Sequence, residues 1–383
     1  MISLHISHTD IQNDSRILKE MDAVRGISGI AVVGIGIGET DVRNGPIRTV
    51  RNFSRRIKLR SHVLSKPLKM IALLAVYFRL LWRSGLTRAE VVHCHDWFVL
   101  PIGTVHSFIW SSILIYDAHE LESDTNTRSR LRKRTAFFVE RLCWKRINGF
   151  ITVSSSILEW YNNNFGPKKN SAVVLNSPVI RSDSDTSQSD TMVMNLRRTY
   201  GIPRGKSLGV YLGGLETGRG LDIILEAVAG IPDQTHVLFI GYGSYAQTLQ
   251  AKAEQMNCSN VTFVGRIPHD KVVGYINECD YGLCLIEPVS LSDVYSLPNK
   301  LFEYVHAGLY VFGSELPEIK KFLATTDFGT VIDSTPEALR KAISGENFPK
   351  TDTGLKTVPV EFGWPAQADA IRGLYNNALY KPN

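Results

Sequence analysis

A glycine-rich segment in the second half of the chain carries residues that suit a phosphate. Gly213, Gly214 and Arg219 follow the apolar run 210–212 and precede a run with helical periodicity. Glycines let backbone N–H groups approach a phosphate closely beside a helix N-terminus. An arginine adds a fixed positive charge that can chelate diphosphate oxygens. The pattern indicates a phosphate site, and the alternative is an ordinary turn with a surface arginine.

A second segment, 298–308, points to the same ligand. Pro298 favours a helix start, where the first N–H groups, from Asn299 onward, have no partner within the helix. Lys300 adds a cation at that point, so the helix start can bind a second side of a diphosphate. Glu303 lies about one turn further on, where a carboxylate can accept both hydroxyls of a ribose. The alternative for Glu303 is a surface glutamate that caps the helix.

Polar residues also follow two buried strands of the first half. His93, His95 and Asp96 end one strand, and His119 and Glu120 end the next. In a parallel sheet, functional residues lie just beyond the carboxyl ends of the strands. A single histidine in such a place is usually structural, but three at adjacent strand ends favour a functional site.

Other patterns in the sequence do not indicate a functional site. The glycines of the run 34–38 fall on a second strand, and no helix opens on them, so they do not indicate a dinucleotide site. Asp183 and Asp185 form a D-x-D pattern inside a polar linker without a preceding strand. Five scattered cysteines fit neither a zinc site nor a disulfide framework. We therefore expect no metal cofactor.

The elements that position these residues alternate between strand and helix through both halves. This alternation predicts α/β architecture with two doubly wound, Rossmann-like parallel sheets, and 383 residues suit two domains. We expect an N-terminal domain over 1–180, a Ser/Asp-rich linker and a C-terminal domain over 195–362. The remaining segment, 363–383, is expected to form a terminal helix from Trp364 to Tyr380. Expected strands cover 2–7, 29–37, 89–96, 113–120, 149–156, 208–214, 236–243, 260–266, 281–287, 309–314 and 330–333.

The charge is unevenly distributed. Between Arg43 and Arg88 the chain has twelve Lys or Arg residues and no Asp or Glu, although its net charge is only +6. Within this segment the apolar run 70–82 contains Arg79, and a second basic cluster covers 128–134. Basic residues beside an apolar, Trp-bearing helix suit the surface of an anionic membrane. The alternative is a solvated basic face with the apolar run in the core. No nucleic-acid motif accompanies the charge.

We expect no membrane span. The uncharged stretch 98–116 contains proline, glycine and hydroxyl residues, and it predicts a buried helix followed by a buried strand. The N-terminus lacks a signal-peptide pattern, so we expect a cytoplasmic protein, peripheral at the inner face of the cell membrane.

Together the motifs resemble retaining glycosyltransferase family 4, whose fold is called GT-B, over nearly the whole chain. The segment SLPNKLFEYVHAGLYVFGS is similar to members that build bacterial surface polysaccharides. The resemblance implies two facing Rossmann-like domains, with the C-terminal helix returning to the N-domain. It also implies retention of configuration and a nucleotide diphosphate sugar, most commonly a UDP-sugar, as donor.

The resemblance assigns roles residue by residue. The phosphate pattern places its second basic residue at Arg219, and Gly214 replaces the first. The family often has a glutamate eight residues before Glu303; here that position is Tyr295, and Glu287, on a longer loop, is the candidate to replace it. The motif YDAHE resembles the loop whose histidine, His119, points at the donor sugar. The donor-binding set is Gly213, Gly214, Gly241, Gly243, Arg266, Ile267, Asn299 and Leu301.

The sequence therefore predicts metal-independent sugar transfer to a glycan acceptor, in polysaccharide biosynthesis and with a lipid-linked acceptor. His119, Arg219, Lys300 and Glu303 would be catalytic, and His95, Asp96 and Glu120 would lie on the acceptor side. The alternatives are a non-catalytic partner protein of the same fold, which the change to Tyr295 favours, and a sugar-nucleotide epimerase of similar architecture.

Overall fold

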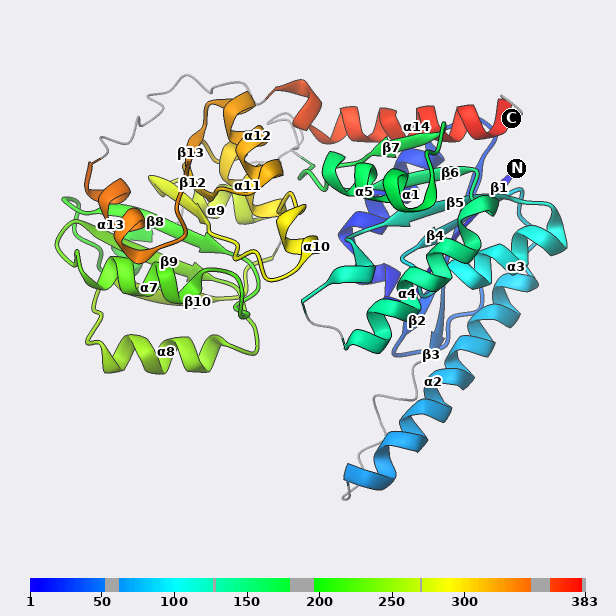
Figure 1. Ribbon diagram of the computed structural model, residues 1–383, viewed down its shortest axis with the longest axis horizontal. Coiled ribbons are helices and arrows are strands. Elements are labelled where there is room, and N and C mark those ends of the chain that lie inside the picture. Colours follow the sequence, from blue (N-terminus) through cyan, green and yellow to red (C-terminus); the bar gives the residue numbers. More distant parts are fainter. Residues whose placement is uncertain (52–61, 127–128, 180–195, 269–270, 346–358, 381–383) are drawn as a thin grey trace. The chain divides into compact units, whose positions relative to one another are not determined.

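The computed structural model describes residues 1–51, 62–126, 129–179, 196–268, 271–345 and 359–380. The chain forms two compact units (Figure 1). Unit 1 consists of Met1–Val174 and Pro365–Asn383, and unit 2 consists of Leu175–Trp364. The end of the chain therefore packs with its beginning.

Unit 1 is built on a seven-stranded sheet in which every strand pair is parallel, in the order β3-β2-β1-β4-β5-β6-β7. The order reverses between β1 and β4, which is where a doubly wound sheet opens for a ligand. The strands are β1 (Ile2–Ser7), β2 (Ala31–Gly38), β3 (Ile47–Arg51), β4 (Val91–His95), β5 (Ile113–Ala118), β6 (Gly149–Thr152) and β7 (Ser171–Val173).

Helices connect and cover these strands. They are α1 (Ser15–Arg25), α2 (His62–Gly85), α3 (Leu100–Trp110), α4 (Arg130–Cys143), α5 (Ser155–Phe165) and α14 (Trp364–Tyr380). Asp14 caps α1 by accepting from the Ile17 N–H at 3.2 Å, as an aspartate at this position does readily. Helix α14, red in Figure 1, is fixed to unit 1 because Arg372 donates to the Ala23 carbonyl at 3.2 Å.

Two parts of unit 1 differ from the sequence prediction. Strand β3 lies inside the basic segment, where no strand was expected; burial of Thr49 and Val50 in its middle outweighs the flanking charges. Helix α3 and strand β5 form as expected from 98–116, but α3 is not fully buried. Its exposed large side chains are Val105, Phe108, Ile109 and Trp110. No helix among the described residues is long and apolar enough to cross a membrane.

Unit 2 contains a six-stranded parallel sheet in the order β10-β9-β8-β11-β12-β13, with its reversal between β8 and β11. Alternate residues of a strand face opposite sides. Accordingly Tyr211 and Leu212 of β8 belong to two different apolar clusters. The strands are β8 (Ser207–Leu212), β9 (Thr235–Ile240), β10 (Val261–Gly265), β11 (Tyr281–Cys284), β12 (Tyr310–Ser314) and β13 (Gly329–Ile332).

The helices of unit 2 are α6 (Leu196–Thr199), α7 (Leu221–Ala229), α8 (Ala246–Gln255), α9 (Val272–Ile276), α10 (Leu291–Val294), α11 (Asn299–His306), α12 (Pro317–Thr326) and α13 (Pro336–Gly345). The predicted helix in 298–308 is thus confirmed, as is the terminal helix. Both sheets are parallel and doubly wound, as the alternating pattern predicted.

Candidate active site

The glycine loops of unit 2 follow β8 and β9 and are bonded to each other. The Gly213 N–H donates to the Ile240 carbonyl at 2.9 Å, and the Leu215 N–H donates to the Tyr242 carbonyl at 3.0 Å. Gly241 has a φ of 145°, and a Cβ there would lie 1.8 Å from the Gly213 carbonyl oxygen. This position therefore accepts only glycine.

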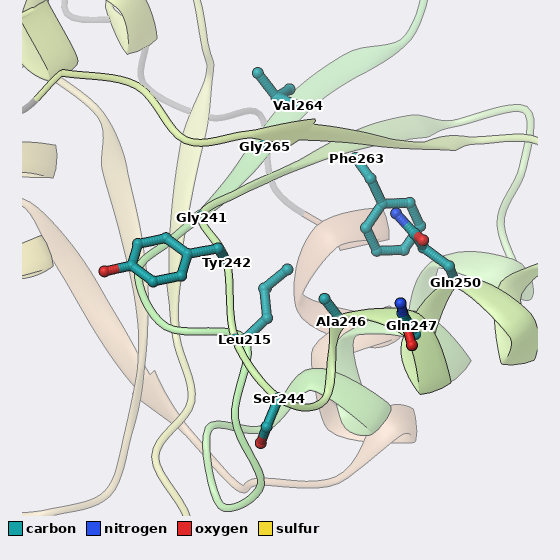
Figure 2. A pocket seen from close by; sticks show the side chains of 11 residues that line it. Leu215, Gly241, Tyr242, Ser244, Ala246, Gln247, Gln250, Phe263, Val264 and Gly265 are labelled. Atoms are coloured by element: carbon teal, nitrogen blue, oxygen red, sulfur yellow. The ribbon is translucent and has the colours of Figure 1, made fainter. Parts of the chain in front are cut away.

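Gly243 is equally constrained, because its Cβ would lie 2.1 Å from the Leu215 carbonyl oxygen. Gly214 is different: the nearest atom to a Cβ there is the Glu216 Cγ at 3.7 Å, so a side chain would fit. Beside these turns lies a cavity of about 560 Å³ (Figure 2), between the turn after β9, the end of β10 and helix α8. Gly241 and Gly243 line it, together with Gln247 and Phe263.

Lys300 reaches the first glycine loop from the start of α11. Its Nζ lies 3.8 Å from the centroid of the Tyr211 ring. Its Cε and Nζ lie 3.6 Å from the point where a Gly213 Cβ would stand. The Tyr211 hydroxyl in turn donates to the Gly214 carbonyl at 2.8 Å. The structure thus brings Lys300 next to Gly213 and Gly214, which are far from it in the sequence.

Arg219 lies at the other end of the loop, one residue before the Gly220 that caps α7. Its Nη1 forms an ion pair with Asp293 at 3.4 Å, and its side chain is 40% exposed. Asp293 also accepts from the Ser290 hydroxyl at 2.6 Å. Because a guanidinium has five N–H donors, this ion pair orients Arg219 and leaves donors for an anion.

Glu303 is nearly buried in α11, with 6% exposure, and so is not the surface residue that the alternative required. Leu301 is fully buried, and its N–H donates to the Pro298 carbonyl at 3.0 Å, whereas Asn299 is exposed at the helix start. Glu287 supports the glycine loop: its carboxylate accepts from the Gly220 N–H at 3.2 Å.

The remaining donor residues follow β10. The Arg266 guanidinium lies 5.2 Å from the centroid of the Tyr242 ring, in a cation–π contact that connects two of the turns. Ile267 packs against the apolar core that contains Leu212 and Leu301. Side chains from three separate turns therefore border the same end of the sheet.

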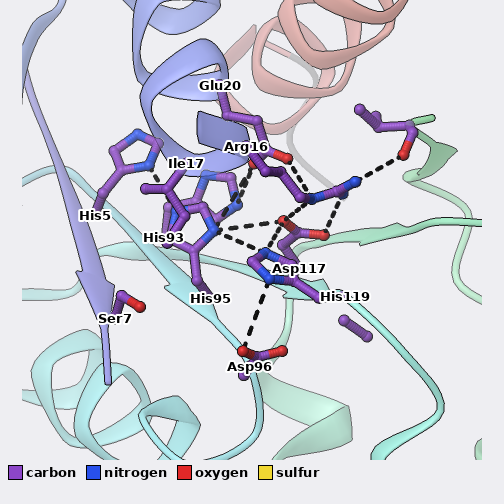
Figure 3. Close-up of polar contacts among 12 residues, drawn as sticks. His5, Ser7, Arg16, Ile17, Glu20, His93, His95, Asp96, Asp117 and His119 are labelled. Carbon is purple, nitrogen blue, oxygen red and sulfur yellow. Dashed lines mark hydrogen bonds and ion pairs between the residues drawn. The ribbon is translucent and has the colours of Figure 1, made fainter. Parts of the chain in front are cut away.

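In unit 1, the predicted histidines belong to a larger buried network (Figure 3). His95, which we expected on the acceptor side, is the last residue of β4 and is completely buried. Strand register explains why, since His95 is opposite Ser7 of β1 and Asp117 of β5, at the centre of the sheet. A residue buried there cannot contact an acceptor, so it acts on the residues around it.

The network leads from His119 into the core. The His119 Nε2 lies 2.8 Å from the Asp117 carboxylate and 3.4 Å from the His95 Nδ1. The His95 Nε2 lies 3.0 Å from the His5 Nδ1. The hydroxyl of Tyr375, from α14, lies 2.9 Å from the His93 Nδ1. The outer end of the network is Asp96, 3.7 Å from the His119 Nδ1, while Glu120 is exposed.

Arg16 of α1 is the cation of this network. Its Nη2 lies 3.0 Å from Asp117, its Nε lies 3.0 Å from Glu20, and its Nη1 donates to the Val174 carbonyl at 3.1 Å. Both carboxylates are completely buried. Burial raises the pKa of Asp117, but the charges of Arg16 and His119 outweigh burial and hold that pKa well below its usual range.

The same interactions set the charge of His119. Burial lowers its pKa, but the carboxylates of Asp96 and Asp117 outweigh burial and raise the pKa to about 10. Burial, followed by the charge of Asp117, raises the pKa of Glu20 to about 8. At neutral pH, His119 is therefore a cation that donates hydrogen bonds, and Glu20 is protonated.

Some of these side chains are close enough to one another to hold an ion. Ligand atoms of His5, His93 and His95, and of Glu20, His93, His95 and Asp117, lie within 4.8 Å of each other. The charge of the Asp117 carboxylate is already balanced by Arg16 and the protonated His119, and Glu20 is neutral at pH 7. We interpret the cluster as an ion-pair network.

Sequence reasoning missed Arg16, Glu20, Tyr375 and Asp293. Arg16 and Glu20 are four residues apart in α1, beside the apolar positions of Ile17 and Met21, and both are buried. Opposite charges at that spacing next to an apolar stripe were the available signal. Nothing local distinguished Asp293 or Tyr375, whose roles come from long-range packing.

Known proteins are similar to this chain in unit 2 and over its whole length. The sequence model of the family Glycosyl transferases group 1 matches residues 206–345, within unit 2. A D-inositol 3-phosphate glycosyltransferase from Corynebacterium aurimucosum is 22% identical over 311 residues, which are 76% of this chain and 72% of that protein.

Two solved structures are similar over almost the whole length. The sucrose-phosphate synthase of Thermosynechococcus elongatus has a TM-score of 0.71 at 17% identity, covering 98% of both chains. Anabaena HepE in complex with UDP and glucose has a TM-score of 0.72 at 15% identity, covering 98% of this chain and 100% of that one. The predicted GT-B fold is thereby confirmed.

Proposed function

Because the chain is a glycosyltransferase with the GT-B fold, whose residues 206–345 match group 1 of these enzymes, we propose that it transfers a sugar from a UDP-sugar with retention of configuration. The acceptor is a lipid-linked glycan, and the reaction belongs to polysaccharide biosynthesis at the inner face of the cell membrane. The transfer requires no metal. The complexes of HepE with UDP and with UDP-glucose support the choice of nucleotide.

The proposal rests mainly on a cationic phosphate seat, by which we mean the phosphate-binding site formed by Lys300, Arg219 and the loop at Gly213. Lys300 stands over the loop at Gly213, and Arg219 is held at the other end of that loop by Asp293. The start of α11 adds backbone N–H groups without partners in the helix. Cations and N–H dipoles fixed in place stabilise the negative charge that builds on the leaving diphosphate, which is the role of a metal in other transferases.

His119 acts on the sugar. Its protonated ring is oriented from both sides, by Asp117 and Asp96. It can therefore donate a hydrogen bond to a sugar oxygen while an oxocarbenium-like centre develops. Glu303 of α11 binds the ribose hydroxyls. Tyr295 stands where the family often has a second glutamate, so this part of the proposal does not assign that glutamate's role to Glu287.

The membrane part of the proposal rests on α2. The helix exposes large apolar side chains at Ile71, Leu74, Phe78 and Trp82, and it buries Val76 and Leu80 on its opposite face. Successive exposed residues are three or four positions apart, so they form one stripe. This stripe lies within the basic segment. Residues 52–61 of that segment, including Arg55, Arg56 and Lys58, lie outside the described part of the chain.

Calorimetry with UDP, GDP, ADP and their glucose derivatives tests the donor site. Arg219→Ala is expected to weaken binding of the UDP-sugar by about 1.5–3 kcal/mol, the range for charge-assisted hydrogen bonds. Arg204→Ala, an exposed arginine of the same unit, is the matched control and should leave affinity unchanged. Equal affinities for the two variants would exclude Arg219 from the phosphate seat.

Further measurements test the role of Glu303, metal independence, retention of configuration and the alternative functions one by one. Glu303→Ala should cut turnover at least tenfold and leave the fold intact. Activity should survive EDTA, and a loss restored by manganese would contradict metal independence. Nuclear magnetic resonance of the first product reports whether configuration is retained. Donor hydrolysis without any acceptor excludes a non-catalytic partner protein, and a free epimer as product would favour the epimerase.

A further inference from the structure

A second cavity, of about 720 Å³, lies in unit 1 between α2 and the strands β2 and β3. It is lined by four arginines, Arg43, Arg48, Arg79 and Arg83, and by apolar residues that include Ile35. Gly34, the neighbour of Ile35 in β2, faces Met21 of α1. Alternate residues face opposite sides of a sheet, so this cavity lies on the face opposite to the histidine network.

Three of the four arginines are held in place by hydrogen bonds within the protein, whereas Arg43 is largely exposed. Arg83 donates to the Val42 and Thr49 carbonyls at 3.1 and 2.9 Å. Arg48 donates to the Thr87 hydroxyl at 3.1 Å. Arg79 donates to Asp41 at 3.0 Å. Guanidinium groups fixed in this way lose little side-chain entropy when they bind an anion.

Among the described residues that line the cavity there are four arginines and no acidic side chain. Asp41 forms ion pairs with three of the arginines, Arg43, Arg79 and Arg83, at 3.9, 3.0 and 2.7 Å. One carboxylate cannot neutralise three guanidinium groups, and Arg48 adds a fourth. The cavity therefore carries excess positive charge, and guanidinium forks match phosphate oxygens geometrically.

An apolar surface continues from this charged cavity. Phe78, Trp82 and Leu86 line the cavity and are 64%, 70% and 68% exposed. Phe78 and Trp82 continue the stripe of Ile71 and Leu74 along α2, and Leu86 follows the end of this helix. A soluble phosphate gives such a stripe nothing to contact, and a nucleobase would stack on one ring without covering its length, whereas an anion attached to a hydrocarbon chain fits both parts.

We propose that this cavity binds the phosphate headgroup of an anionic membrane phospholipid, with its acyl region against Phe78, Trp82 and Leu86. The inference rests on the proposed membrane location and adds a specific lipid site to it. General attraction of a basic face requires only charge near the bilayer. The cavity instead requires phosphate and an apolar chain on the same molecule.

The test compares two pairs of arginine substitutions in the full chain. Arg43→Gln with Arg79→Gln removes two charges from the cavity, and Arg130→Gln with Arg134→Gln removes two exposed charges from α4. Binding is measured on vesicles of phosphatidylcholine with or without phosphatidylglycerol. Two cations near an anionic surface correspond to about thirtyfold in affinity. We expect at least that loss for the cavity pair and less than about threefold for the α4 pair.

Short-chain lipid below its micelle concentration tests the cavity without a bilayer. Dihexanoyl phosphatidylglycerol should bind one to one and shift the fluorescence of the exposed Trp82, and Trp82→Phe should remove the shift. Inorganic phosphate should compete at least a hundredfold less well. Unchanged UDP affinity in every variant shows that the fold and the donor site of unit 2 are intact.

Several outcomes overturn the inference and leave the proposed transferase untouched. Equal losses for the two arginine pairs, or none for the cavity pair, mean that membrane binding uses general charge alone. Equal binding of dihexanoyl phosphatidylcholine removes the requirement for an anion. Tighter binding of an isoprenyl diphosphate than of phosphatidylglycerol assigns the cavity to the acceptor instead of the membrane lipid.

Discussion

Replacing Arg16 with methionine tests the ion-pair network most directly. Arg16 is 6% exposed, and its guanidinium pairs with Asp117 and Glu20, which are both completely buried. The substitution retains most of the apolar volume and removes the charge. It leaves Asp117 as a buried anion with only His119 to balance it.

The expected cost follows from burial. Breaking a buried ion pair by removing one partner costs about 3–5 kcal/mol, because the other charge remains in a medium of low polarity. Glu20→Gln provides the matched control in the same network. Since the pKa of Glu20 is raised to about 8, foremost by burial, its carboxyl is neutral at pH 7 and resembles an amide. We expect this variant to cost less than about 1 kcal/mol.

Urea unfolding followed by tryptophan fluorescence measures both costs. Five of the six tryptophans, all except Trp364, belong to unit 1, so the signal reports mainly on the unit that contains the network. Trp97 and Trp144 are buried there and should respond strongly. The reasoning would be refuted if Glu20→Gln destabilised the protein as much as Arg16→Met, or if neither had an effect.

Further predictions concern the dependence of stability on pH and two glycine substitutions. Burial lowers the pKa of three histidines, which the unfolded chain protonates below pH 6.5: His5, His93 and His95. The unfolded chain therefore takes up protons that these native histidines do not hold, although native Glu20 retains one proton there. The free energy of unfolding should fall as pH is lowered from 6.5 to 5, by about 1.4 kcal/mol per pH unit for each net proton taken up. The raised pKa values of Glu20 and His119 act in the opposite direction, because these groups stabilise the fold while they are protonated. That stabilisation is lost as pH rises through about 8 for Glu20 and about 10 for His119. Urea midpoints that do not change from pH 5 to 9 would contradict the predicted effects of acid and of alkali. Gly241→Ala should destabilise unit 2 and abolish UDP binding in calorimetry, whereas Gly274→Ala, with open space around it, should keep that binding. Gly373→Ala, exposed inside α14 with no atom near its Cβ position, should raise stability to urea by about 0.5–1 kcal/mol.

Local patterns were sufficient for much of the fold. Alternating strand and helix signals predicted both parallel sheets, and the run 364–380 matched α14 residue for residue. The glycine loop and the helix start at Asn299 were readable because a tight turn and a helix terminus depend on adjacent residues. The GT-B fold was implied by the resemblance of these motifs to glycosyltransferase family 4.

Long-range packing decided the rest. The sequence places His95 and Asp117 at strand ends, but the register of β1, β4 and β5 determines that they face each other beneath α1. Only that packing surrounds Arg16 with carboxylates and removes water from them, and only then do their pKa values shift. The excess of arginine between 43 and 88 was visible as composition. Only the packing of β3 against α2 gathers four of these arginines around one cavity and places that cavity beside an apolar stripe. Burial and charge pairing depend on neighbours in space, which the composition does not show.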